Sequence, residues 1–327
     1  MGTTHLKALG GIRGARVAAV FSPFESQLTG DLTSGLGNLG APAERLDLGD
    51  AARYREMDAL FADPAIDAVD ICLPTYLHVA AAIAALRAGK HVLVEKPLAL
   101  DAAAAHRVVD EAEKQGRILM CAHVLRFWPA YVAMREAALS RGLGTMRFGL
   151  FRRRCAVPAW SEWLRDPARS GGVFDLLIHD VDWCLHQFGK PAAVSACGYS
   201  GPAVGLDCLD AQLFYEQGAV ISVTGGWHHA GAYPFSMEFT VSYDGGTVEY
   251  SSAGRAPALY APGCAAELLD VPESDPYAAE IEYFVECCRT GRQPELCPPR
   301  QSAEAVRLML DLLESRRRGG ERIACNR

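Results

Sequence analysis

Short apolar runs alternate with helix-length segments over the first third of the chain. Runs rich in Val, Ile and Leu predict four strands, at Ala15–Val20, Ala68–Leu73, His91–Glu95 and Arg117–Cys121. Apolar residues at helical spacing predict three helices between them, at Asp50–Ala62, Tyr76–Ala88 and Asp101–Gln115. Continuous apolar strands separated by helices are typical of a parallel sheet that is buried on both faces. This part of the chain therefore predicts an α/β domain.

The pattern changes after Cys121. Helical spacing continues at Pro129–Arg141 and Gly171–Phe188, and alternating runs then predict antiparallel strands at Ala211–Tyr215, Ala219–Val223 and Phe235–Tyr243. The turn signals Gln217-Gly218 and Asp244-Gly245-Gly246 follow these strands, and helices at Ala278–Arg289 and Ser302–Ser315 end the pattern. We expect an α+β C-terminal domain with an open, mainly antiparallel sheet, and domains at residues 1–122 and 123–327.

Composition narrows the class of protein. The chain has 327 residues, 50% of them hydrophobic, and 32 Lys and Arg against 39 Asp and Glu give a net charge of −7. An acidic chain without a long basic run is not expected to bind nucleic acid. It has no apolar stretch of the roughly 18 residues that a membrane span needs, and its N-terminus does not resemble a signal peptide. We therefore expect a soluble cytoplasmic protein.

The cysteines and paired histidines give no sign of a metal site. The 11 cysteines are scattered and form no C-x-x-C pair, which fits a reducing compartment. His228 and His229 follow a predicted strand, but no acidic residue stands at metal-ligand spacing from them. No metal is expected.

The predicted α/β domain lacks the usual opening of a dinucleotide site. Such domains begin with a strand that runs into G-x-G-x-x-G and a helix, because glycines let the backbone approach a pyrophosphate at the helix N-terminus. Gly2 matches the last glycine of that turn, and the first strand and two earlier glycines are absent from this chain. Met1 is then either the true start or an internal methionine, and in the first case we expect poor stability.

The second strand also departs from the usual pattern. An acidic residue normally ends it and binds the adenosine ribose, whereas here Ser22 follows the strand. A neutral residue is compatible with a 2′-phosphorylated cofactor, although no arginine stands beside Ser22 in the sequence. The cofactor is expected to be NAD or NADP.

Several motifs stand in one order along the chain. The strand at His91–Val94 runs into Glu95-Lys96-Pro97, and Leu73-Pro74-Thr75 with His78 precedes it by one strand. Downstream follow Ser170-Gly171-Gly172, Asp175, His179-Asp180, Asp182, and then Asp275–Phe284 with Gly291 and Pro294. Together these resemble the glucose-fructose oxidoreductase, inositol dehydrogenase and MocA family over nearly the whole chain.

The resemblance implies a Rossmann-like domain and a second domain whose open sheet packs against another subunit, in a homodimer or homotetramer. It implies hydride exchange between a nicotinamide and a carbon of a sugar or polyol. Lys96, Asp175 and His179 match the family's catalytic positions. The cofactor-binding residues it implies are Gly2, Ser22, Leu73, Pro74, Thr75, His78, Glu95, Lys96 and Pro97. Candidate substrate-binding residues are Arg126, Trp160, Trp163 and Asp182.

One helix carries the predicted catalytic pair. Asp175, His179, Asp182 and His186 are spaced 4, 3 and 4 apart, which puts them on one stripe of an otherwise apolar helix. The alternative is a solvent-facing stripe, but ordinary exposed faces favour Lys and Glu over Asp and His. We expect His179 to act as acid and base, Asp175 to orient it or bind substrate, and Lys96 to stabilise an alkoxide.

Two other functions stay open at this stage. A glycosidase of this fold keeps its nicotinamide bound and uses transient oxidation, so the absence of net cofactor reduction would identify it. A non-catalytic sugar or nucleotide-binding regulator would keep the fold, and the incomplete glycine turn makes it more credible.

Overall fold

The chain folds into two compact units. The computed structural model describes residues 1–31, 45–159, 161–201 and 206–325. The first unit holds Met1–His123 together with Asp275–Ala303, and the second holds Val124–Ser274 together with Glu304–Arg327. This division differs from the expected 1–122 and 123–327, because helix α10 (Pro276–Thr290) packs against α1 (Gly2–Leu9) of the first unit.

Parallel strands form the sheet of the first unit. Strands β3 (Ala68–Ile71), β4 (His91–Glu95) and β5 (Leu119–Ala122) pair in that order, with Ala68 opposite His91 and Val92 opposite Leu119. All residues of β4 except His91 are buried, as the apolar pattern predicts for a strand covered on both faces. The predicted parallel α/β arrangement is confirmed.

A second, smaller sheet belongs to the same unit. Strand β1 (Ala19–Phe21) pairs in parallel with β2 (Ala52–Tyr54), and Ala19 lies opposite Ala52. The prediction of one helix over Asp50–Ala62 is therefore wrong in its first half. The helix, α3, covers only Met57–Ala62, because the backbone of residues 52–54 hydrogen-bonds to β1 instead.

Helices cover the sheet of the first unit. Helix η1 (Thr75–Leu77) leads into α4 (His78–Arg87), which packs on β3, β4 and α5 (Ala102–Gln115). The carboxylate of Asp101 accepts a hydrogen bond of 2.8 Å from the backbone N–H of Ala104 and so caps the N-terminus of α5. Gly116 ends α5 at a φ of 61°, in the left-handed region that favours glycine. A short helix, α2 (Glu25–Leu28), follows β1.

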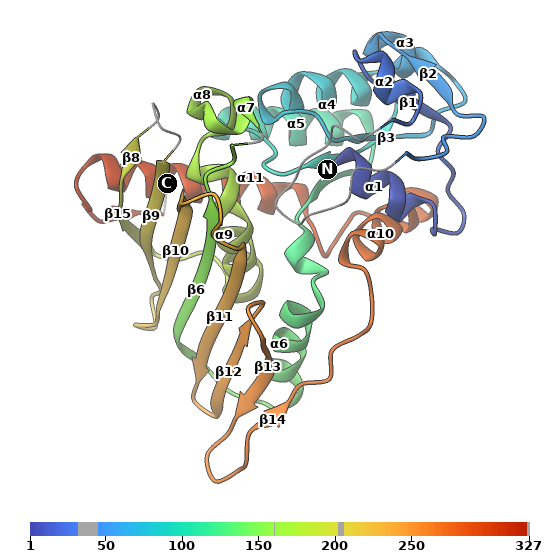
Figure 1. The fold of residues 1–327 in the computed structure, drawn as a ribbon. Coiled ribbons are helices and arrows are strands. Elements are labelled where there is room, and N and C mark those ends of the chain that lie inside the picture. The colour runs from blue at the N-terminus through green and yellow to red at the C-terminus, as the bar shows by residue number, and fades with distance from the viewer. Residues whose placement is uncertain (32–44, 160, 202–205, 326–327) are drawn as a thin grey trace. The chain divides into compact units, whose positions relative to one another are not determined.

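A large open sheet dominates the second unit (Figure 1). Within the described residues its order is β14-β13-β12-β11-β6-β10-β9-β7-β15, and β8 pairs with β9. Among the described strand pairs of this sheet β6–β10 alone is parallel, so the predicted open, mainly antiparallel sheet is confirmed. The strands are β6 (Met146–Ala156), β7 (Ala193–Cys197), β8 (Ser200–Gly201), β9 (Leu206–Phe214), β10 (Val220–His229), β11 (Ser236–Tyr243), β12 (Gly246–Ser251), β13 (Arg255–Tyr260), β14 (Glu267–Leu268) and β15 (Ile323–Ala324).

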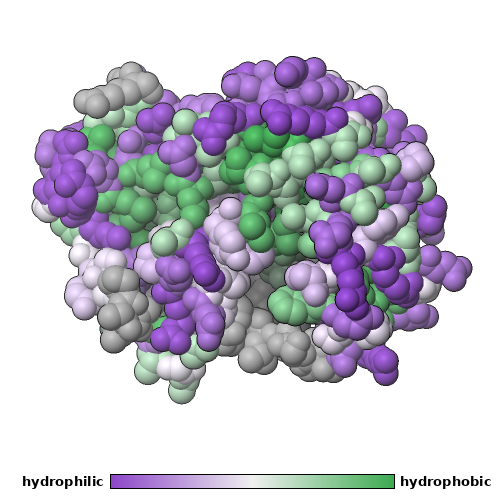
Figure 2. Space-filling model, turned by 90° about the horizontal axis from the view of Figure 1, so that it is seen from above, coloured by the Kyte–Doolittle hydropathy of each residue, from purple (hydrophilic) through white to green (hydrophobic). Residues whose placement is uncertain are grey.

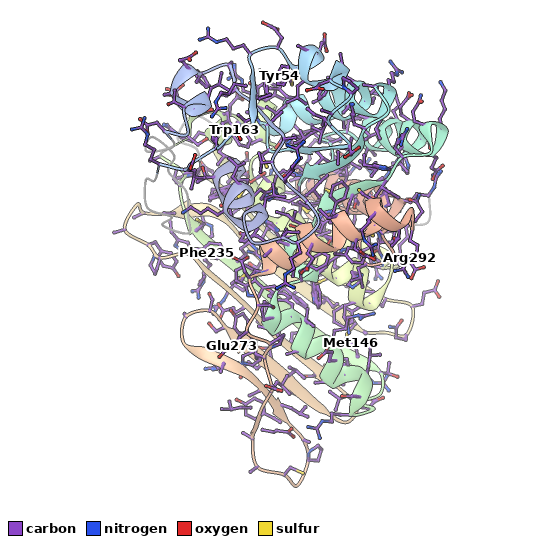
Figure 3. All side chains as sticks on the ribbon, turned by 90° about the vertical axis from the view of Figure 1, so that its right-hand side faces the viewer. Tyr54, Met146, Trp163, Phe235, Glu273 and Arg292 are labelled. Carbon is purple, nitrogen blue, oxygen red and sulfur yellow. The ribbon has the colours of Figure 1, made fainter. Side chains whose placement is uncertain are left out.

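The inner face of this sheet packs on helix α9 (Val173–Phe188), which contacts β6 and β10. Its core is aromatic: Tyr131 lies edge-on to Trp183, with ring centroids 5.2 Å apart, and edge-on to Phe239, at 5.0 Å. The other helices of this unit are η2 (Val124–Arg126), α6 (Pro129–Ser140), α7 (Glu162–Arg165) and α8 (Pro167–Ser170), with the part of α11 (Pro299–Arg317) that follows Ala303. Met146 and Phe235 mark opposite ends of the β6–β11 pair (Figure 3).

The surface carries hydrophilic side chains with apolar ones exposed between them (Figure 2). Large exposed apolar side chains include Phe24 and Tyr76 of the first unit and Phe148 and Tyr199 of the second. No helix in the described parts of the chain is long and apolar enough to span a bilayer. All 11 cysteines are free thiols, as their scatter along the chain predicts.

Candidate active site

Two loops follow adjacent parallel strands of the first unit. Leu73, Pro74 and Thr75 come after β3, and Lys96 and Pro97 come after β4. Open α/β sheets bind their ligands at the carboxyl ends of parallel strands. Five of the predicted cofactor residues thus follow strands at the edge where sheets of this type bind ligands: Leu73, Pro74, Thr75, Lys96 and Pro97.

The imidazole of His78 joins these two loops. Its Nδ1 lies 2.8 Å from the carbonyl oxygen of Pro97, and its Nε2 lies 2.7 Å from the carbonyl oxygen of Leu73. The ring is 1% exposed, so it acts as a buried strut between the ends of β3 and β4. His78, which was predicted to bind cofactor, therefore holds the backbone that follows each strand.

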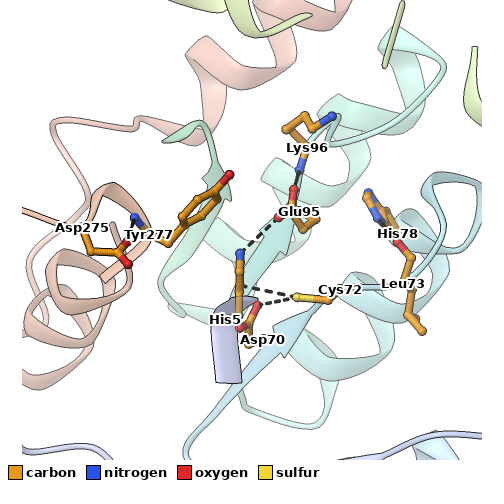
Figure 4. A network of polar contacts seen from close by, with 9 residues as sticks. All are labelled: His5, Asp70, Cys72, Leu73, His78, Glu95, Lys96, Asp275 and Tyr277. Atoms are coloured by element: carbon orange, nitrogen blue, oxygen red, sulfur yellow. Dashed lines mark hydrogen bonds and ion pairs between the residues drawn. The ribbon is translucent and has the colours of Figure 1, made fainter. Parts of the chain in front are cut away.

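A polar network lies beneath the same edge (Figure 4). His5 of α1 places Nδ1 at 2.8 Å from Asp70 Oδ2 and Nε2 at 3.1 Å from Glu95 Oε1. The thiol of Cys72 lies 3.4 Å from the same Nδ1. The backbone N–H of Lys96 donates to Glu95 Oε2 at 3.0 Å. Through Glu95, the network fixes the backbone from which the Lys96 side chain emerges.

Burial and charge act against each other in this network. Burial opposes the charged form of His5, but the charges and hydrogen bonds of Asp70 and Cys72 hold its pKa well above the usual value. Burial would raise the pKa of Glu95, yet the hydrogen bond and charge of His5 lower it to about 2. Burial and the charge of Asp70 raise the pKa of the Cys72 thiol to about 12. The geometry and these shifts describe an imidazolium between two carboxylates.

Ser22 follows β1 and is buried. Its hydroxyl donates to Gln27 Oε1 at 2.6 Å and accepts from the backbone N–H of Phe24 at 3.1 Å, which fixes the turn into α2. Its own N–H donates to the carbonyl of Tyr54 on β2. No arginine stands next to Ser22 in the sequence. In the structure, the pairing of β1 with β2 places Arg55, the residue after Tyr54, close to Ser22.

The second unit holds the predicted catalytic helix, α9. Gly171 and Gly172 precede it with φ values of 80° and 64°. Gly172 has no side chain with which to cap the helix, and Asp207 of β9 supplies one: its Oδ2 accepts from the backbone N–H of Val173 at 2.7 Å. A Cβ on Gly172 would lie 2.1 Å from that oxygen, so only glycine fits here. Trp227 Nε1 donates to the Gly172 carbonyl at 3.2 Å.

The polar stripe of α9 is largely buried. Asp175 is 6% exposed and Asp182 is 0% exposed, whereas His179 and His186 are partly exposed. A solvent-facing stripe is therefore excluded for the two aspartates. Asp175 stands one helical turn before His179, as the spacing predicts.

Two buried ion pairs attach α9 to its surroundings. Arg126 of η2 donates two parallel hydrogen bonds to the carboxylate of Asp182, from Nε to Oδ2 at 2.9 Å and from Nη2 to Oδ1 at 2.6 Å. Arg153 of β6 binds Asp180 through Nε at 2.6 Å. Both members of the first pair have fully buried side chains. Arg126 and Asp182, predicted to bind substrate, thus hold η2 and α9 together.

The remaining predicted residues are placed as follows. Gly2 is the first residue of α1, at its N-terminus, and Trp163 lies partly buried on α7. Trp160 lies outside the described residues. The structure thus groups Lys96 with the loop residues in the first unit, and Asp175, His179, Arg126, Asp182 and Trp163 in the second.

Sequence reasoning missed several residues that shape these groups. These residues could not be recognised from local spacing, because their partners stand 27 to 65 residues away along the chain; they are His5, Asp70, Asp207 and Arg153. The sequence offers one signal: the apolar strand predicted at Ala68–Leu73 contains a carboxylate, Asp70, which is unusual for a strand buried on both faces.

Comparison with known protein families accounts for both units. Residues 1–123 match the family model described as "Oxidoreductase family, NAD-binding Rossmann fold", and residues 131–249 match that of the "GFO/IDH/MocA C-terminal domain". The chain belongs to the GFO/IDH/MocA oxidoreductase family. The predicted resemblance is confirmed, and the chain is an NAD(P)-dependent oxidoreductase with an NAD-binding Rossmann fold.

Relatives within the GFO/IDH/MocA family include sugar dehydrogenases. UDP-N-acetylglucosamine 3-dehydrogenase of Acidithiobacillus ferrooxidans is 28% identical over 258 residues, 75% of this chain and 76% of that protein. D-glucoside 3-dehydrogenase of Escherichia coli is 30% identical over 209 residues, 63% of this chain and 55% of that protein. A probable dehydrogenase from Thermotoga maritima shares the fold, with a TM-score of 0.80 at 23% identity and coverage of 99% and 96% of the two chains.

Proposed function

We propose that this protein transfers a hydride between a nicotinamide and a secondary alcohol or carbonyl carbon of a sugar, polyol or sugar derivative. The observation that carries the proposal is the buried Asp175 one turn before His179 on a helix whose start is fixed by Asp207. Two relatives that are named as sugar 3-dehydrogenases support the substrate class.

The loops of the first unit fit a dinucleotide. Leu73, Thr75 and Pro97 follow adjacent parallel strands, and His78 fixes the two loops through their carbonyls. Gly2 is the first residue of α1, and a helix N-terminus offers backbone N–H groups to a pyrophosphate. When bound, the nicotinamide supplies the hydride acceptor or donor.

The chain's own residues would then handle the proton and the developing charge. His179 takes the hydroxyl proton as the alcohol is oxidised and returns it in reduction, a task suited to an imidazole at neutral pH. Asp175 orients that ring or binds a neighbouring hydroxyl. Lys96, whose backbone is fixed through Glu95, stabilises the alkoxide with its ammonium group.

The test is a comparison of His179→Ala with His179→Gln and the unaltered enzyme. We expect the alanine variant to lose turnover by about 10²- to 10⁴-fold, the usual contribution of general acid–base catalysis, while circular dichroism and the unfolding temperature stay unchanged. Normal turnover in the alanine variant would exclude His179 as the acid and base.

Assembly and location belong to the same proposal. The alternate residues of β6 on the outer face of the sheet include Phe148, which is 45% exposed, and this face supports a homodimer or homotetramer. Free thiols support a cytoplasmic location. Light scattering of Phe148→Asp against the unaltered chain tests the assembly: a smaller mass supports it, and an unchanged oligomer contradicts the use of this face.

A further inference from the structure

Three groups able to bind a metal meet inside the first unit. His5 Nδ1 lies 2.8 Å from Asp70 Oδ2 and 3.4 Å from Cys72 Sγ, and the thiol lies 3.6 Å from the other oxygen, Oδ1, of the same carboxylate. Among the described residues this is a cluster whose ligand atoms all lie within 4.8 Å of one another. The ligands come from α1 and from β3 and the residue after it, so the fold and not a local motif assembles them.

These separations are close to those around a tetrahedral zinc ion. With Zn–N and Zn–O bonds of about 2.0–2.2 Å and a Zn–S bond of about 2.3 Å, tetrahedral angles separate N from O by about 3.4 Å and S from either by about 3.6 Å. The Nδ1–Sγ separation of 3.4 Å and the Sγ–Oδ1 separation of 3.6 Å are close to these values. The other carboxylate oxygen, Oδ2, lies 2.8 Å from Nδ1, so this separation must lengthen by about 0.6 Å if Oδ2 is the ligand.

The far side of the His5 ring is arranged as in many metal sites. A metal-bound histidine usually donates its other ring N–H to a carboxylate, which fixes the tautomer and the ring plane. Glu95 Oε1 occupies that position, 3.1 Å from Nε2, and the Lys96 backbone N–H holds the same carboxylate. The ring of His5 is 1% exposed, so its orientation is set by these contacts.

An ion could enter without unfolding the unit. The Asp70 side chain is 22% exposed and Cys72 is partly exposed, so the cluster has one side toward solvent. Three protein ligands leave a fourth position, which water fills in open zinc sites. Figure 4 shows the three side chains converging between α1 and β3.

We propose that His5, Asp70 and Cys72 bind a divalent transition-metal ion of the zinc class, with Glu95 supporting His5. The ion would replace two protons, one from His5 Nδ1 and one from Cys72 Sγ.

Cobalt(II) titration of the metal-free full chain, with a phosphine as reductant, tests the site. We expect one equivalent to give tetrahedral d–d bands and a thiolate-to-cobalt charge-transfer band, with protons released into weakly buffered solution. Zinc should displace the cobalt and bleach both signals. Absence of the charge-transfer band at millimolar cobalt would overturn the proposal.

Matched variants separate this thiol from the other ten. Cys72→Ser should abolish the charge-transfer band, whereas Cys264→Ser, which removes an exposed thiol, should retain it. Glu95→Gln should weaken binding by about 10- to 100-fold, the usual effect of losing a supporting carboxylate. A band that persists in Cys72→Ser would overturn the assignment, and circular dichroism identifies a variant that fails to fold. If Cys72→Ser fails to fold, Cys72→Ala, which also removes the thiol, provides the same test. The proposal does not rest on hydride transfer, because its readout is spectral.

Discussion

Asp207 caps a helix that begins 34 residues earlier in the chain: its Oδ2 accepts from the backbone N–H of Val173 at 2.7 Å. Arg316 Nη1 donates to the other oxygen, Oδ1, at 2.5 Å. A strand residue and a distant arginine thus fix the start of α9, which carries the proposed catalytic pair two and six residues farther on.

Removing the Asp207 cap should lower the catalytic rate although the protein stays folded. We expect Asp207→Ala to lower the free energy of unfolding by about 0.5–2 kcal/mol, the usual cost of a lost N-cap, and to lower kcat more than it raises KM. Asp207→Asn keeps an oxygen acceptor and should recover most of kcat. Equal kcat in all three proteins, measured with stability by urea unfolding, would show that the cap does not position the site.

Gly172 should tolerate no side chain. Gly172→Ala would put a Cβ 2.1 Å from Asp207 Oδ2 at a φ of 64°, so we expect a stability loss above the roughly 1–2 kcal/mol of left-handed strain alone. Gly189→Ala is the control, because its φ is 80° and no atom lies within 4 Å of the added Cβ. Equal unfolding temperatures for the two variants would contradict the close approach.

The Arg126–Asp182 pair should be important for stability. Asp182→Ala leaves a fully buried guanidinium without its bidentate partner, and breaking such a pair costs about 3–5 kcal/mol. We expect urea unfolding to show this loss. Exposed Glu286, which pairs with Arg289 on α10, provides the control: Glu286→Ala should change stability by less than about 1 kcal/mol. A small effect at Asp182 would argue for direct substrate binding instead.

Arg55 should favour the phosphorylated cofactor. The pairing of β1 with β2 places Arg55 close to the turn at Ser22, where an arginine can bind the 2′-phosphate of NADP. Its guanidinium now pairs with exposed Glu25. We expect Arg55→Ala to weaken NADP(H) binding while NAD(H) binding is retained, and Glu25→Ala to strengthen NADP(H) binding. Equal losses for both cofactors, measured by fluorescence titration, would exclude this role.

His91 should make stability fall in mild acid. Its Nδ1 accepts from the backbone N–H of Ile118 at 2.9 Å, and burial, followed by the charge of Arg117, lowers its pKa. The unfolded chain therefore takes up the proton first, so stability is complete above the unfolded pKa of about 6.5 and is lost as pH falls through the folded pKa. His91→Asn retains an acceptor without titrating, and its unfolding temperature should fall less between neutral and mildly acidic pH. Parallel pH profiles would contradict this.

Elements with a strong local pattern were predictable from sequence. The bounds of β4 agree with the prediction, and α5 ends at Gln115, as its predicted range does. Strand β6 escaped prediction because Arg152, Arg153 and Arg154 break its apolar pattern. Tertiary structure explains them: Arg153 is buried against Asp180, and its two neighbours bind Glu238 on β11.

The site was predictable only where the family motifs lie. The Glu95-Lys96-Pro97 turn and the Asp175–His179 spacing were visible in the sequence, as was the glycine pair before α9. The contacts that fix them were not, because His5 reaches Asp70 across 65 residues and Asp207 reaches Val173 across 34. Such pairings depend on the fold, which a local pattern does not encode.

The proposed reaction transfers a hydride from a carbinol carbon to a nicotinamide. The direct measurement offers the enzyme a panel of sugars and polyols, each with deuterium on one carbinol carbon, together with NAD or NADP, and analyses the cofactor by mass spectrometry. We expect one class of substrate to deliver its deuterium to the nicotinamide ring, with net reduction that Lys96→Ala and His179→Ala abolish. A cofactor that binds but stays unlabelled and oxidised with every sugar and polyol would contradict the proposed hydride transfer.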